Sequence, residues 1–180
     1  MCGRSPISVK KLSQAEFDAV GEKRVVAAIE AAQKQLWDFD KRLLELDAHE
    51  RSICFRLAVY LAEQFPEFDV DCEYNRNHAD KRYQKRLRDT DLIKLVARQK
   101  RLGNEDGLMI LPDIIVHIRD TPLNLLVVEI KKSSSQVPED KDLLKLRALK
   151  DELGYLFARF IRFRVGQATE EEGVAESRFI

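Results

Sequence analysis

Two short apolar runs separated by a turn-like segment place the strongest constraint on how this chain can fold. Ile114–Ile118 and Leu125–Ile130 are rich in Val and Ile, which predicts two buried β-strands. The linker Asp120–Asn124 has the length of a hairpin connection and contains Asp, Pro and Asn, which favour turns. The stretch is therefore predicted to form a β-hairpin whose strands are buried.

Charged residues interrupt the apolar runs at one end of this predicted hairpin. Asp113 begins the first strand, and Glu129 and Lys131 end the second on one face, because side chains alternate along a strand. Antiparallel pairing of the strands would bring Asp113 close to Glu129 and Lys131. Burial of such charges is costly unless they are paired or bind a cation. Carboxylate oxygens suit Mg²⁺ or Mn²⁺, so the sequence predicts a metal site here.

The same residues carry a resemblance to a known family. Pro112-Asp113, a gap of fifteen residues and Glu129-Ile130-Lys131 resemble the signature of the PD-(D/E)xK nuclease superfamily. The predicted strands on both sides make the match more specific than the short motif is by itself. The resemblance implies a metal-dependent phosphodiesterase in which Asp113 and Glu129 bind Mg²⁺ (or Mn²⁺) and Lys131 is catalytic. The alternative is a surface hairpin that ends in an ordinary Glu–Lys pair.

Two helical segments precede the first strand. Residues 14–46 carry apolar residues at three- and four-residue steps, with a break expected at Gly21. This segment is either a dimerisation helix or a helix packed on its own domain. A second helix is predicted over residues 47–64, with Asp47 as its cap. In the resembled superfamily this helix often carries a glutamate that joins the metal site. The resemblance therefore makes Glu50 a candidate catalytic and metal-binding residue. The alternative role of Glu50 is in a capping box with Asp47.

A half-buried strand is predicted over residues 68–74, where apolar and acidic residues alternate strictly. One face is expected to be apolar and the other to be a solvated acidic edge. The apolar face comprises Phe68, Val70, Cys72 and Tyr74.

Positive charge is concentrated in one segment of a chain whose formal net charge is zero. Residues 76–102 contain ten Lys or Arg and three Asp. Clustered cations bind nucleic acid because they release counterions from its phosphates. This basic insertion (about 76–108) is therefore predicted to contact phosphates. The alternative is an ordinary charged surface helix. Lys145-Leu146, which follow the E-x-K triplet on a helix, are also similar to nuclease branches of the superfamily. The predicted nucleic-acid-binding residues are Lys81, Arg82, Lys85, Arg86 and Lys145.

The element order predicts an α/β fold. A helix over residues 139–153 and a strand over 155–165 complete a strand–helix–strand crossover unit. The resulting α-β-β-β-α-β order is the restriction-endonuclease-like core that the resemblance implies: a mixed central sheet flanked by helices, over residues 47–165. Residues 1–46 are expected to be a leader and an N-terminal helical extension, and residues 166–180 an acidic mobile tail.

Composition limits the compartment and the class. No apolar run approaches the length of a membrane span, and residues 1–11 lack the apolar core of a secretory signal. Three scattered cysteines argue against a disulfide framework and a zinc site, and Cys54 and Cys72 are expected to be small core residues. A cytoplasmic protein is the prediction.

The predicted function is hydrolysis of phosphodiester bonds in nucleic acid, with DNA as the first choice of substrate, by an Mg²⁺-dependent endonuclease. One alternative is a non-catalytic nucleic-acid-binding or assembly module of the same fold. The other is a helical protein-interaction subunit, in which residues 14–46 would form a homodimer.

Overall fold

The computed structural model describes residues 12–74, 86–87, 108–109, 111–170 and 173–180. The chain begins with three helices, α1 (Gln14–Asp18), α2 (Glu22–Glu45) and α3 (Glu50–Gln64). Gly21 is the N-cap of α2, so the break expected at this glycine is confirmed. The apolar side of α2 is buried and packs on α3, which favours a helix packed on its own domain.

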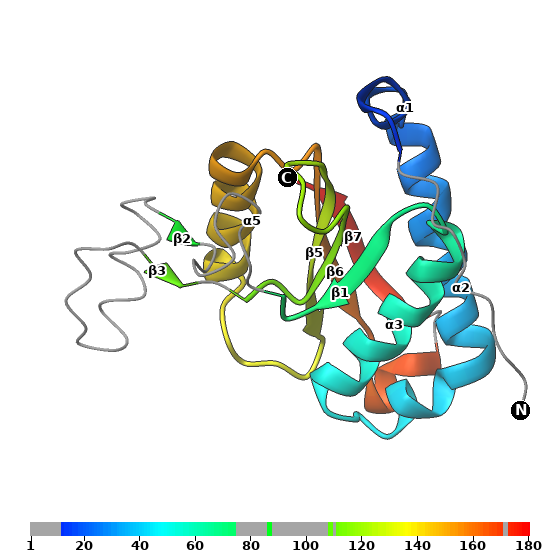
Figure 1. Cartoon of the computed structure of the whole chain (residues 1–180). Helices are drawn as coiled ribbons and strands as arrows, with labels where there is room; N and C mark the ends of the chain where they lie inside the picture. The colour runs from blue at the N-terminus through cyan, green and yellow to red at the C-terminus, as the bar shows by residue number, and fades with distance from the viewer. Residues whose placement is uncertain (1–11, 75–85, 88–107, 110, 171–172) are drawn as a thin grey trace, which may run out of the picture.

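A mixed five-stranded sheet follows (Figure 1). Its strand order is β1-β4-β5-β6-β7. Its strands are β1 (Asp69–Cys72), β4 (Ile114–His117), β5 (Asn124–Lys132), β6 (Phe157–Phe163) and β7 (Val174–Phe179). Neighbouring strands are antiparallel except β5 and β6, which are parallel and joined through helix α5 (Asp140–Leu153). Strands β2 (Arg86–Leu87) and β3 (Leu108–Met109) form a separate two-stranded sheet. The predicted hairpin, mixed sheet and crossover helix are confirmed.

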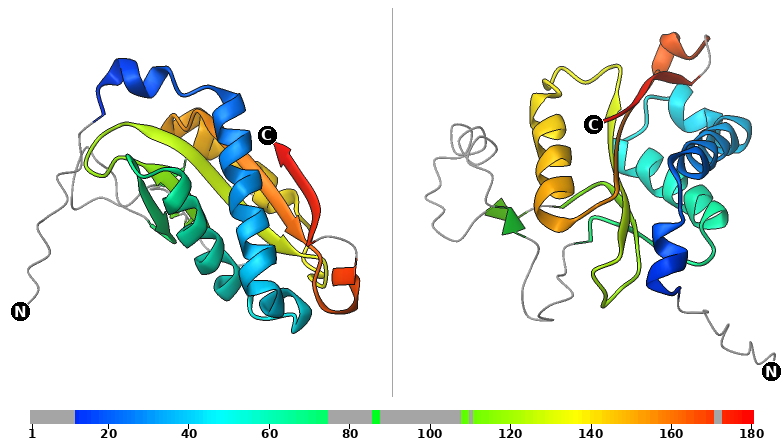
Figure 2. Two further views of the ribbon diagram at one scale, coloured as in Figure 1. Left: turned by 90° about the vertical axis from the view of Figure 1, so that its right-hand side faces the viewer. Right: turned by 90° about the horizontal axis from the view of Figure 1, so that it is seen from above.

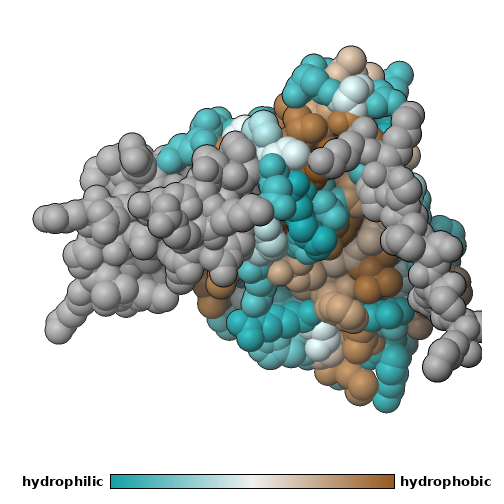
Figure 3. Space-filling model, viewed as in Figure 1, coloured by the Kyte–Doolittle hydropathy of each residue, from teal (hydrophilic) through white to brown (hydrophobic). Residues whose placement is uncertain are grey.

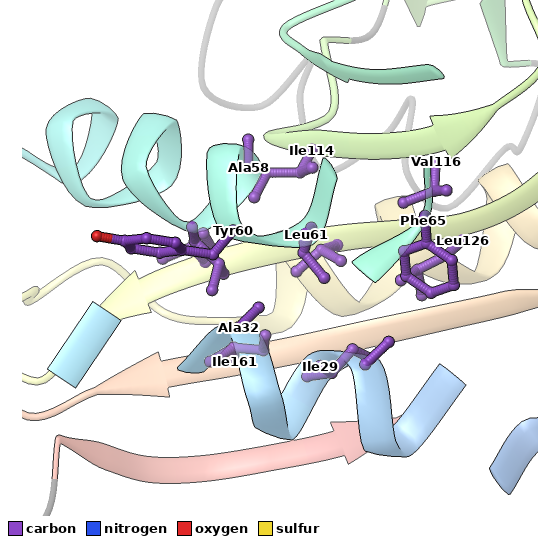
Figure 4. Packing of buried hydrophobic residues seen from close by; sticks show 14 of the residues in the cluster. Ile29, Ala32, Ala58, Tyr60, Leu61, Phe65, Ile114, Val116, Leu126 and Ile161 are labelled. Atoms are coloured by element: carbon purple, nitrogen blue, oxygen red, sulfur yellow. The ribbon is translucent and has the colours of Figure 1, made fainter. Parts of the chain in front are cut away.

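Helices cover both faces of the sheet (Figure 2). Alternate residues of β5 point to opposite faces: Val128 and Ile130 belong to the larger core under α2 and α3, and Val127 to the smaller core under α5. Every residue of β5 from Asn124 to Lys131 is buried, so the charges near its end are enclosed by protein. Figure 4 shows the packing of the larger core, with labelled side chains Ile29, Ala32, Ala58, Tyr60, Leu61, Phe65, Ile114, Val116, Leu126 and Ile161.

The start of α3 differs from the prediction. Its N-cap is His49, whose ring nitrogen accepts a hydrogen bond from the Arg51 amide at 3.2 Å. Asp47 lies outside the helix with a positive φ of 49°, and its carboxylate accepts a hydrogen bond from Lys132 Nζ at 2.7 Å. The capping role expected of Asp47 is therefore wrong, because the carboxylate instead makes a charge-assisted hydrogen bond with β5.

The strict alternation expected over residues 68–74 ends at Glu73. This residue has a positive φ of 50°, which turns the chain after β1. Tyr74 consequently packs with the core under α5, where its ring lies 5.0 Å from the ring of His117. It does not share a face with Val70 and Cys72, which pack against the larger core.

The described residues 166–170 and 173–180 differ from the expected mobile tail. They contain a 3₁₀ helix, η1 (Gly166–Glu170), and β7, which pairs with β6 and forms the edge of the sheet. Arg178 of β7 forms an ion pair with Glu139 at 2.7 Å, and Phe179 packs against the larger core. Pairing to the free edge of β6 therefore orders a segment whose composition by itself suggests a solvated chain end.

The face seen in Figure 1 mixes hydrophilic and hydrophobic residues over its helices (Figure 3). Exposed large apolar side chains include Phe39 of α2 and Phe55 of α3. Among the helices that the structure describes, none has the combination of length and apolar character needed to cross a membrane.

Candidate functional site

The pairing of β4 with β5 brings the two predicted metal-binding carboxylates together. Ile114 lies opposite Val128 in an antiparallel register, so Asp113 lies beside Glu129. The Ile130 amide donates a hydrogen bond to Asp113 Oδ2 at 2.7 Å, and the Asp113 amide donates to Glu129 Oε1 at 3.4 Å. The predicted proximity of Asp113 and Glu129 is confirmed, and it follows from the hairpin alone.

Helix α5 adds two charged residues to this end of the sheet. Lys131 Nζ forms an ion pair with Asp142 at 2.6 Å, and Lys145 Nζ forms one with Glu129. Lys145 also donates to the Leu111 carbonyl at 3.2 Å. Asp142 and Lys145 are three residues apart on the helix, so they share a face. We call Glu50, Asp113, Glu129, Lys131, Asp142 and Lys145 the carboxylate–lysine cluster.

Asp142 is a member of the cluster that the sequence patterns did not identify. Lys145, a predicted nucleic-acid-binding residue, lies at the active end of α5 with its side chain mostly buried beside Glu129. A sequence signal for Asp142 did exist. It lies four residues before Leu146, which belongs to the buried stripe of α5, so an acidic side chain stands on the face that packs against the sheet.

Glu50 reaches the same cluster from the start of α3. Its carboxylate accepts a hydrogen bond from the backbone amide of Lys132. Burial raises the pKa of Glu50, and the nearby charge of Asp113 raises it further. The structure therefore brings Glu50 together with Asp113, as the resemblance implied, and away from the capping box with Asp47.

Burial dominates the electrostatics of the central pair. Glu129 is only 2% exposed, and burial raises its pKa well above the usual value, with the charge of Asp113 adding to the shift. Burial likewise raises the pKa of Asp113, although Lys145 and the Ile130 amide oppose the shift. Burial lowers the pKa of Lys145, but the carboxylates of Glu129 and Asp113 outweigh it and leave the pKa raised. The carboxylates are thus short of positive charge even with two lysines beside them.

A pocket of about 350 Å³ opens onto part of the cluster. Glu50 and Asp113 line it together, and an ion pair of 2.8 Å between Arg51 and Glu73 lies in its wall. The remaining lining residues are His49, Cys54 and Cys72. A small ligand or cation in this pocket would therefore meet the carboxylates of Glu50 and Asp113 directly.

The chain's own donors engage the oxygens of the cluster. Within the described ranges, no group of three or more His, Cys, Asp or Glu side chains is arranged to hold a metal ion. Glu129 could join such a site only by exchanging its ion pair with Lys145 for the cation.

The predicted nucleic-acid-binding residues of the basic insertion are Lys81, Arg82, Lys85 and Arg86. Lys81, Arg82 and Lys85 lie outside the described residues. Arg86 belongs to β2, but its side chain is likewise outside the description.

Comparison of the chain with protein-family models, with curated proteins and with solved structures found no match. The class of protein that the observations define is a mixed α/β fold with a buried carboxylate–lysine cluster at one end of its sheet.

Proposed function

We propose that this protein is a metal-dependent nuclease of the PD-(D/E)xK type that hydrolyses phosphodiester bonds, with DNA as its substrate. The observation that carries the proposal is the meeting of Asp113, Glu129 and Lys131 at the end of a buried hairpin, next to Glu50. The order α3-β1-β4-β5-α5-β6 supports it, since the resemblance implies an α-β-β-β-α-β core.

The residues that would hold Mg²⁺ or Mn²⁺ are Asp113, Glu129 and Glu50. They offer only oxygen ligands, which these hard cations prefer. Their raised pKa values also support the assignment, because a divalent cation would offset the cost of keeping neighbouring carboxylates ionised. When bound, the ion would stabilise negative charge on the phosphate and lower the pKa of an attacking water.

Lys131 is the residue we propose to act on the substrate. Asp142 forms an ion pair with its ammonium group at 2.6 Å, which fixes the direction of the group. A preorganised cation of this kind stabilises the charge that develops on a phosphate oxygen in the transition state. Lys145 supplies a second ammonium group to the same cluster. If Glu129 bound a metal ion in place of Lys145, the ammonium group of Lys145 would be available to contact the phosphate.

The test is incubation of the purified chain with plasmid, linear duplex, single-stranded DNA and RNA, in Mg²⁺, Mn²⁺ or EDTA. Cleavage of DNA is expected with either ion and none with EDTA. Asp113→Asn should abolish cleavage, because it removes one of the charged ligands. Asp38→Asn is the matched control, since Asp38 lies in an exposed ion pair with Lys34 on α2. Metal-dependent cleavage that survives in Asp113→Asn would contradict the site, and no cleavage of any substrate would contradict the function.

One observation favours a second candidate, a non-catalytic nucleic-acid-binding module of the same fold. Both lysines of the cluster are paired with carboxylates of the chain itself, so the cluster is also a self-contained structural unit. This candidate predicts DNA binding that weakens with salt and no cleavage with either ion. The incubations above therefore separate the two functions.

A further inference from the structure

Two cysteines from different elements meet in the wall of the pocket. Cys54 belongs to α3 and Cys72 to β1, and their sulfur atoms lie 3.9 Å apart. Both thiols are free. Cys54 is buried, whereas Cys72 is partly exposed. Both line the pocket that Glu50 and Asp113 also line.

We propose that Cys54 and Cys72 are a reversible thiol–disulfide pair, a modification site that reacts with low-molecular-weight disulfides such as oxidised glutathione. The sulfur of Cys72, the more accessible of the two, attacks one sulfur of the oxidant and releases one glutathione thiolate. The sulfur of Cys54 then attacks the mixed disulfide at Cys72 and releases the second glutathione. Two protein thiols are oxidised, one glutathione disulfide is reduced, and the two thiol protons pass to the two glutathione thiolates.

The geometry favours an intramolecular bond over two separate adducts. A disulfide joins sulfur atoms about 2.05 Å apart, so the observed separation must shorten by about 2 Å. Rotation of the side chains and a small approach of α3 to β1, which already pack together, would supply that movement. A glutathione on Cys72 would in turn lie directly beside the sulfur of Cys54, which makes displacement faster than addition of a second glutathione.

The disulfide would act on the elements that position the candidate metal ligands. In the reduced protein the Cys54 thiol donates a hydrogen bond to the Asp113 carbonyl at 3.2 Å, and oxidation removes that donor. Glu50 lies one turn before Cys54 on the same face of α3. Glu73, the residue after Cys72, donates its amide to the Asp113 carbonyl at 3.3 Å. Oxidation therefore pulls on both sides of the Glu50–Asp113 pair and should weaken metal binding there; this consequence rests on the proposed function.

The first experiment uses the full chain with Cys2→Ser, which leaves Cys54 and Cys72 as its two cysteines. After treatment with oxidised glutathione, intact mass and peptide mapping should show loss of both thiols and a crosslink between the peptides of residues 54 and 72. Dithiothreitol should reverse it. Cys54→Ser in the same background should instead accumulate glutathione on Cys72. Cys72→Ser is a second variant, which leaves Cys54 as the remaining thiol. Because Cys54 is buried, this variant should not react with oxidised glutathione. Stable glutathione adducts without the crosslink, or thiols that react only in urea, would overturn the proposal.

The second experiment measures Mn²⁺ binding by calorimetry before and after oxidation. We expect the oxidised protein to bind about tenfold more weakly, within the usual range of coupling between neighbouring sites. The oxidant should leave Mn²⁺ binding unchanged in Cys72→Ser. Equal affinity in a fully crosslinked protein would overturn the coupling. Failure of the proposed function is distinct from both results, because it appears as a lack of cleavage by the reduced protein with Mn²⁺ present.

Discussion

Replacement of Lys145 by Met tests whether the buried ion pair between Lys145 and Glu129 stabilises the folded protein. The Lys145 side chain is 14% exposed and that of its partner Glu129 is 2% exposed, so the ion pair is shielded from water. Met retains most of the aliphatic stem and removes the ammonium group. Removal of one partner from a buried pair costs about 3–5 kcal/mol, because the other charge stays buried without compensation. We expect a loss of this size in the free energy of unfolding at pH 7.5, measured by urea denaturation.

The pH dependence gives the sign of the effect. Burial already raises the pKa of Glu129 in the folded state above its value in the unfolded chain, and loss of Lys145 should raise it further. The native state then binds more protons than the unfolded state in the interval above the ordinary pKa of 4.5, so stability falls as the pH rises through that interval. The penalty of Lys145→Met should therefore be smaller at pH 5 than at pH 7.5.

Two controls complete this test. The double variant Lys145→Met, Glu129→Gln leaves no unpaired charge at this position and should recover part of the lost stability. Mn²⁺ should also stabilise the single variant, by about 2.7 kcal/mol at one hundred times its dissociation constant. A single variant that loses less than about 1 kcal/mol, or loses the same at both pH values, would refute a buried charge pair.

Three further predictions use other residues. Lys131→Ala should lower the turnover rate by a factor of about 10²–10³ and retain Mn²⁺ binding. Lys34→Ala, a surface control on α2, should leave the turnover rate unchanged. Equal turnover rates in the two variants would contradict a catalytic role for Lys131. Lys132→Ala should lower the free energy of unfolding by about 1 kcal/mol, because Lys132 Nζ bonds the Asp47 carboxylate at 2.7 Å; an unchanged urea midpoint would contradict this. Asp71→Asn should destabilise the protein near neutral pH, because hydrogen bonds from His117 and Arg119 outweigh burial and lower the pKa of Asp71 to about 2. Since that stabilisation is present above the ordinary pKa of 3.8 and disappears as the pH falls through about 2, the wild type and Asp71→Asn should converge in stability over this range, and a constant difference would contradict the assignment.

The hairpin and its carboxylate pair could be predicted because they depend on local rules. Strand periodicity sets which face Glu129 occupies, and a short turn sets the antiparallel register that places Asp113 beside it. Neither step requires knowledge of the rest of the chain. The same applies to α5, whose leucine stripe identifies the buried side of the helix.

The partners of the two lysines could not be predicted, because long side chains choose among several nearby carboxylates. Lys131 was expected beside Asp113 and Glu129, yet its ammonium group bonds Asp142, and Lys145 takes Glu129. The choice depends on the rotation of α5 against the sheet, which comes from packing of the whole domain. Strand β7 was missed for a related reason: its pairing requires the free edge of β6, which no local pattern in residues 174–179 reveals.

The charge of the cluster connects its structure to the proposed chemistry. Glu50, Asp113, Glu129 and Asp142 contribute four carboxylates, and Lys131 and Lys145 contribute two ammonium groups. With all groups ionised the net charge is minus two, in a region where burial raises the pKa of Glu50, Asp113 and Glu129. Two protons or one divalent cation would neutralise it. Protons suffice at low pH, but near neutrality the cost of protonation grows, and the proposed Mg²⁺ would then be the less costly source of compensating charge. The excess of carboxylates makes the buried cluster unfavourable for folding. The same excess would give this site its affinity for the proposed metal ion.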